Sequence, residues 1–198
     1  MPERIANADG LPGDLQLALA PSRVYAQLLS AETPPSWLRT LGRPVLFAVL
    51  VGVSIAIAAA GYVSPGLLLS TTCSWSWVMA PQLLFAVGMT RPLPHDGSIS
   101  AARAFELWFA GHVPWTLWVL MLAPLLRIVP DTPAELLILS ALVPMAWTAA
   151  IAAAFGRVVL RQSEREAWLR AALHQLVLLG VILSYVAWSA GGWFRLVQ

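Results

Sequence analysis

Residues 44–63, PVLFAVLVGVSIAIAAAGYV, form an apolar run without a charged side chain. A helix rises about 1.5 Å per residue, so a run of this length crosses the roughly 30 Å hydrocarbon core of a bilayer. The run therefore predicts a transmembrane helix that begins just after Arg43.

Four further apolar runs follow along the chain, at residues 67–90, 107–129, 136–156 and 171–190. Of the 198 residues, 59% are hydrophobic and only 11% are charged, whereas soluble domains carry about 25% charged residues. The runs and their short loops use up almost all of residues 44–198, which leaves no room for a soluble catalytic domain. The sequence predicts an all-α, polytopic membrane bundle with five transmembrane helices.

Residues 1–43 are expected to form a cytoplasmic N-terminal segment. Within it, residues 14–30 (DLQLALAPSRVYAQLLS) place an apolar face at helical spacing, made of Leu15, Leu19, Val24, Leu28 and Leu29. This stretch is too short and too polar to cross a membrane. It predicts a short amphipathic helix that lies in the plane of the membrane surface and is split or started by Pro21.

The distribution of arginine predicts the orientation. All twelve basic residues are arginine, and positive charge collects on the cytoplasmic side of membrane proteins. Five spans with a cytoplasmic N-terminus leave only Arg127 and Arg195 on the outer side. We therefore expect a protein of the bacterial inner membrane with its C-terminus in the periplasm.

Groups that carry chemistry are scarce, and no enzymatic activity is predicted. Cys73 is the only cysteine, which excludes an intrachain disulfide and an iron–sulfur site built by this chain alone. No carboxylate lies in the middle of a predicted span, which argues against ion-coupled transport on an Asp/Glu relay. No metal site and no binding to nucleic acid are predicted; the expected partners are membrane lipids and other integral membrane subunits.

His112 and His174 are the candidates for a cofactor site. They lie in the third and fifth predicted spans, at a similar depth near the cytoplasmic side. Two neutral imidazoles on different helices can ligate a b-type haem from opposite faces, and Gly111 would leave room for a porphyrin. The alternatives are another porphyrin, a quinone, or a structural role in which each histidine donates a hydrogen bond to a neighbouring backbone carbonyl or to Gln175.

Two rows of small residues and one row of arginines are candidate contact surfaces for lipids or partners. Small residues at every fourth position let another helix approach closely, and they occur in the rows Gly52, Ala56, Ala60 and Ala146, Ala150, Ala154. A row on one helical face, Arg157, Arg161 and Arg165, is suited to anionic headgroups or to a partner.

Prolines inside three predicted spans indicate a further alternative. Pro81, Pro114 and Pro144 each remove a backbone hydrogen bond and leave a carbonyl that can line a cavity. A cavity between kinked helices is typical of a small permease or transporter element.

Two N-terminal segments carry a family resemblance. LALAPSRVYAQLL (17–29) and PPSWLRTL (34–41), followed by five hydrophobic spans, resemble the pattern of bacterial members of the Yip family of small five-helix membrane proteins. The resemblance implies this topology and carries over no enzymatic activity.

The favoured function is a non-enzymatic scaffold or accessory subunit of a larger inner-membrane complex, because chemistry is scarce, the loops are short and two small-residue rows are present. The alternatives are a membrane subunit of an electron-transfer complex that binds haem, another porphyrin or a quinone, and a permease element.

Overall fold

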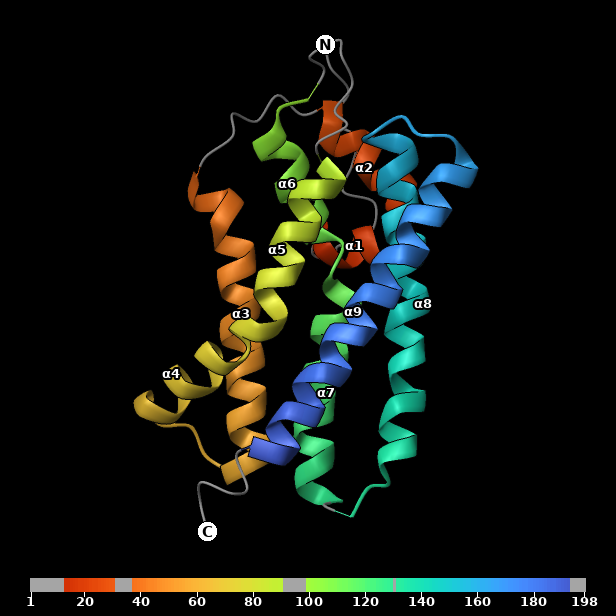
Figure 1. Ribbon diagram of the computed structural model, residues 1–198. Coiled ribbons are helices and arrows are strands. Elements are labelled where there is room, and N and C mark those ends of the chain that lie inside the picture. The colour runs from red at the N-terminus through yellow and green to blue at the C-terminus, as the bar shows by residue number, and fades with distance from the viewer. Residues whose placement is uncertain (1–12, 31–36, 91–98, 130, 193–198) are drawn as a thin grey trace.

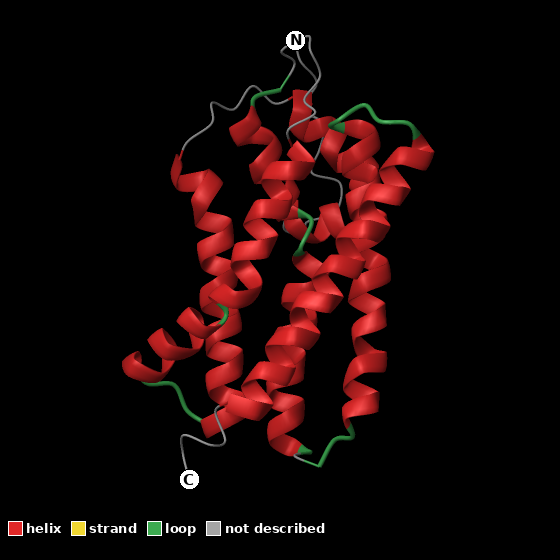
Figure 2. Ribbon diagram, viewed as in Figure 1, coloured by secondary structure: helices red, strands yellow, loops and turns green. Residues whose placement is uncertain are grey.

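The chain folds into a bundle of α-helices, as its composition predicts. The computed structural model describes residues 13–30, 37–90, 99–129 and 131–192, and every regular element in these ranges is a helix (Figure 2). Figure 1 labels the helices in chain order: α1 (Gly13–Leu19), α2 (Pro21–Ser30), α3 (Trp37–Ala60), α4 (Pro65–Ser74), α5 (Ser76–Thr90), α6 (Ala101–Ala110), α7 (Val113–Ile128), α8 (Ala134–Val158) and α9 (Glu164–Gly192).

Four helical stretches are long and apolar enough to cross a membrane. They are Thr40–Ala60 in α3, Ala101–Ile128 across α6 and α7, Glu135–Val158 in α8, and Glu164–Tyr185 in α9. Large apolar side chains on their outer faces are exposed, among them Leu46, Val143 and Leu176. An apolar surface of this extent suits lipid and not water. The four stretches indicate an integral membrane protein and coincide with the first, third, fourth and fifth predicted spans.

The second predicted span is not one continuous helix. The structure divides residues 67–90 at Trp75, so that α4 projects sideways from the bundle and α5 continues along it (Figure 1). Hydroxyl side chains before the break bind nearby carbonyls: Ser74 Oγ donates to the Thr71 carbonyl oxygen at 2.9 Å, and Thr71 Oγ1 lies 2.9 Å from the Gly52 carbonyl oxygen. Such local bonds compete with the backbone hydrogen bonds of the helix. A hydropathy pattern does not predict them, so it did not predict the break.

The third predicted span begins earlier than expected and is broken inside the bundle. It starts at Ala101, where Ser100 Oγ accepts a hydrogen bond from the Arg103 N–H at 3.3 Å. The helix is then interrupted at Gly111, which ends α6, and at His112, which precedes α7. Pro114 contributes to the break because it has no N–H to continue the ladder of α6. As a result His112 sits at a break between two helices, buried in the bundle.

The N-terminal helices pack against the bundle, which the sequence did not predict. Both α1 and α2 pack against α8, and α1 also packs against α7. Leu17 and Tyr25 are each 1% exposed, whereas Leu19, which belongs to the predicted apolar face, is 68% exposed. Val24 of the predicted face is buried together with Leu17 and Tyr25 in an apolar site between helices that are distant in sequence, and Leu28 and Leu29 pack against the same core.

Side chains of the bundle donate hydrogen bonds to backbone carbonyl groups of α1 and α2. Trp147 Nε1 donates to the Ala18 carbonyl oxygen at 2.8 Å, and Arg103 Nη2 donates to the Leu28 carbonyl oxygen at 3.0 Å. Both carbonyls lie near helix ends, where backbone acceptors lack intrahelical partners. Tyr25 Oη donates in return to the Leu107 carbonyl oxygen at 3.3 Å. Burial raises the pKa of Tyr25 above its ordinary value, despite a smaller lowering by Arg43, so the phenol stays protonated and able to donate.

Candidate functional site

The two candidate histidines lie in contact at the centre of the bundle. The ring centroids of His112 and His174 are 5.6 Å apart, and the ring planes meet at 81°. His112 comes from the break between α6 and α7, and His174 comes from α9. Both side chains are buried, so the pair is enclosed by protein.

Both ring nitrogens of His174 are engaged by amide side chains. The Nε2 atom is 3.0 Å from Gln82 Oε1, and the Nδ1 atom is 3.1 Å from Gln175 Nε2. An amide oxygen only accepts and an amide nitrogen only donates, so Nε2 carries the proton and Nδ1 accepts. The ring also packs against Phe85 and Trp108, each with centroids 4.9 Å away. The neutral imidazole of His174 therefore has a hydrogen-bond partner at each ring nitrogen.

The histidine pair does not fit a b-type haem. An iron ligated from both faces requires the flat porphyrin between the two imidazoles. The two rings instead touch edge to face at 5.6 Å, which leaves no slot between them. Both nitrogens of His174 are already occupied by Gln82 and Gln175. The arrangement supports the structural alternative for His174, in which it hydrogen-bonds inside the core.

His112 has one nitrogen in use and one without a partner. Its Nδ1 lies 3.2 Å from the Trp108 carbonyl oxygen; a carbonyl only accepts, so Nδ1 carries the proton. The Nε2 atom is buried and has no hydrogen-bond partner among the described residues. In the neutral ring this atom is an acceptor with a free lone pair.

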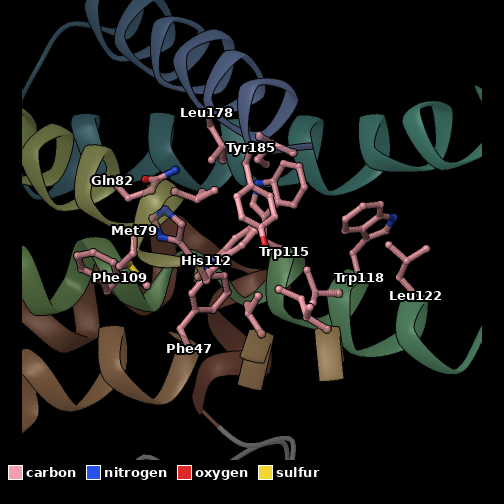
Figure 3. Close-up of a pocket in the computed structure, with 16 residues that line it drawn as sticks. Phe47, Met79, Gln82, Phe109, His112, Trp115, Trp118, Leu122, Leu178 and Tyr185 are labelled. Atoms are coloured by element: carbon pink, nitrogen blue, oxygen red, sulfur yellow. The ribbon is translucent and has the colours of Figure 1, made fainter. Parts of the chain in front are cut away.

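A cavity of about 200 Å³ lies beside His112, between α3, α5, α7 and α9 (Figure 3). His112 and Gln82 lie toward one end of it, and Trp118 and Leu122 lie toward the other (Figure 3). The walls are almost entirely apolar, and aromatic side chains supply much of them, including Phe47, Trp75, Phe109, Trp115, Trp118 and Tyr185.

The size of this cavity limits what it can hold. An engineered cavity of about 150 Å³ in another protein stays dry and binds benzene. A cavity of about 200 Å³ therefore admits one aromatic ring, or the end of an acyl or isoprenoid chain. A porphyrin, with four such rings, is far too large.

The two small-residue rows differ in what they contact. In the first row Gly52 faces α4, where an added Cβ would meet Thr72 Oγ1, and Ala56 is fully buried. In the second row Ala154 is buried, whereas Ala146 and Ala150 are exposed. The first row thus serves mainly contacts within the chain, and most of the second faces outward.

The three arginines do not share one helical face. Arg157 lies near the end of α8, Arg161 in the turn and Arg165 in α9, because the chain turns at Arg161 with a left-handed φ of 54°. Glutamates of α9 offset part of the local charge: Arg157 lies 3.9 Å from Glu164, and a neighbouring arginine, Arg170, lies 2.8 Å from Glu166. The turn is therefore a mixed-charge surface with a basic excess.

Sequence analysis named Gln175, which contacts His174 at 3.1 Å, but it did not identify Gln82 as the second partner of His174 or the members of the cavity. The tryptophans inside the predicted spans and Gln82 are unusual residues for a membrane segment. No periodicity in the sequence shows that their side chains meet at one cavity. The prolines proposed to line a cavity, Pro81, Pro114 and Pro144, are not among the residues that line this one.

Comparisons with known protein families, with curated proteins and with solved structures find no match. The resemblance to the Yip family therefore remains a prediction. Among the described residues, no group of three or more His, Cys, Asp or Glu side chains is placed to hold a metal ion.

Proposed function

We propose that this protein binds a lipophilic molecule from the membrane in the cavity between α3, α5, α7 and α9. The cavity itself is the observation that carries the proposal. Protein interiors contain few voids larger than a water molecule. A pocket of about 200 Å³ leaves its apolar wall atoms without packing partners, which a bound apolar group would supply.

The walls favour an apolar ring or chain over a charged or sugar-like ligand. An apolar cavity of this kind selects by size and shape, and the surrounding lipid supplies candidates such as acyl chains, isoprenoids and the ring of a quinone. The quinone alternative is compatible with the volume, whereas the porphyrin alternative is not. No residue of the cavity is arranged for catalysis, so the proposed activity is binding.

Filling the cavity is expected to abolish binding. Val51 lines the cavity on α3 and is 2% exposed, so Val51→Phe places a ring inside it. With bromobenzene as the probe, heavy-atom quenching of the tryptophans that line the cavity should saturate in the wild-type protein in detergent. In Val51→Phe the affinity for bromobenzene should fall at least about tenfold. The new ring occupies the space in which the ring of the probe would be buried, and that burial contributes more than about 1.4 kcal/mol to binding.

The matched control is Val143→Phe, the same substitution on the outer face of α8, where Val143 is 66% exposed. This variant should quench as the wild type does. Saturable quenching that survives in Val51→Phe, or that is absent from the wild type, would show that the cavity is not the binding site.

A role as an accessory subunit is the second proposal, and the outward position of Ala146 and Ala150 supports it. In lipid, close packing at small residues supplies much of the energy of helix association. We expect Ala150→Leu to release the protein from a larger complex without unfolding it, whereas Ala172→Leu on the exposed face of α9 should not. Migration on native gels after mild extraction measures this, and wild-type protein that runs alone would contradict the proposal.

For the topology we propose five passes through a bacterial inner membrane with a cytoplasmic N-terminus, in which α4 and α5 together make the second pass. The arginine distribution supports this orientation, and so does the alternating direction of α3, α5, α7, α8 and α9 (Figure 1). A reporter fused after residue 198 checks it, since a cytoplasmic signal there would rule out five passes.

A further inference from the structure

A second, smaller cavity lies on the other side of His112. Its volume is about 10 Å³, and its lining includes Tyr25 from α2, Trp108 from α6, His112 from the break and Thr148 from α8. Each of these four side chains carries a polar atom. All four of these residues are at least 92% buried, since none is more than 8% exposed.

Three polar atoms of these residues are buried without a partner among the described residues: His112 Nε2, Trp108 Nε1 and Thr148 Oγ1. A buried polar group without a hydrogen bond costs about 1–3 kcal/mol. Three such groups around one cavity are unlike the ordinary interior, where most buried polar atoms are paired. All three residues line this cavity, so one small polar ligand inside it would supply partners for all three atoms.

The chemistry of the three atoms specifies that ligand. The indole of Trp108 only donates, His112 Nε2 accepts because Nδ1 holds the ring proton, and the hydroxyl of Thr148 does both. The ligand must therefore accept one hydrogen bond, donate another and fit a volume of about 10 Å³. That volume is close to the roughly 10–15 Å³ that one water molecule needs, and a buried water typically makes about three hydrogen bonds.

We propose that this cavity binds one ordered water molecule. The water accepts hydrogen bonds from Trp108 Nε1–H and Thr148 Oγ1–H and donates one to His112 Nε2. The oxygen of Tyr25, whose proton is directed to the Leu107 carbonyl, has lone pairs to accept the water's second proton. The water thereby connects α2, the break between α6 and α7, and α8. It does not depend on a ligand in the large cavity.

Gly111 keeps this site open. A Cβ added at Gly111 would lie 3.0 Å from Tyr25 Oη and 3.0 Å from Ile151 Cγ2. A methyl group at this position enters the space between α2 and α8 that the water needs. Gly111→Ala is therefore a substitution that removes the water without removing any of its polar partners.

The test is nuclear magnetic resonance on the full chain in nanodiscs with ¹⁵N-labelled tryptophan indoles. Trp108→Phe and Trp147→Phe identify the two signals that matter. We expect a cross-relaxation peak between water and the Trp108 indole proton in the wild type. The Trp147 indole, which donates to the Ala18 carbonyl, should show none. In Gly111→Ala the Trp108 peak should fall to the background level of Trp147.

Two outcomes would overturn the proposal. A wild-type spectrum in which Trp108 shows no more contact with water than Trp147 rules out the site, and this measurement needs no variant to fold. A Trp108 peak that persists in Gly111→Ala would instead assign the exchange to the Thr148 hydroxyl, which that variant retains, and Thr148→Val would then remove it.

Discussion

Replacing Leu17 with aspartate is expected to release α1 and α2 from the bundle. Leu17 retains 1% of its exposed surface, so the new carboxylate would be buried among apolar side chains without a cation. The effective penalty for burying an unpaired charge is on the order of several kcal/mol, a large part of the roughly 5–15 kcal/mol that stabilises a typical domain. Limited proteolysis in detergent should therefore cut residues 13–30 at least ten times faster than in the wild type.

Leu19→Asp provides the matched control. It makes the same chemical change two residues further along, at a side chain that is 68% exposed, and it should leave the cleavage rate within twofold of the wild type. Equal protection of both variants would show that α1 is not packed in the bundle. Faster cleavage of Leu19→Asp than of Leu17→Asp would support a helix on the membrane surface, with Leu19 buried in lipid.

The features that sequence predicted well are those with local causes. The apolar run of residues 44–63 becomes most of α3 because its length and composition match a membrane span. Pro21 is the first residue of α2, since its fixed φ suits a helix start.

The features that sequence missed depend on contacts between distant segments. Periodicity places Leu19 and Leu28 on one helical face. Leu28 does pack against the core, but Leu19 is exposed, and Leu17 and Tyr25, which lie outside that face, are buried. The contact between His112 and His174 likewise depends on where the break after α6 meets α9. Side chains from four helices form the large cavity, so the sequence of no single segment predicts it.

Replacing His174 with leucine is expected to destabilise the bundle strongly. Leucine fills a similar space but leaves Gln82 Oε1 and Gln175 Nε2 without the ring nitrogens that they contact at 3.0 and 3.1 Å. Gln82 and Gln175 are both buried, and each unpaired group costs about 1–3 kcal/mol. Unfolding by titration with sodium dodecyl sulfate, followed by circular dichroism, should show a loss of about 2–5 kcal/mol.

A double-mutant cycle separates this hydrogen bond from a simple packing defect. Gln82→Leu alone leaves the His174 Nε2–H unpaired, whereas the double variant His174→Leu with Gln82→Leu removes donor and acceptor together. Replacing both partners of a buried bond with apolar groups costs much less than removing one. The double variant should therefore be more stable than the sum of the two single losses implies, by about 1–3 kcal/mol. Strictly additive losses would mean that the hydrogen bond between His174 and Gln82 contributes nothing to stability.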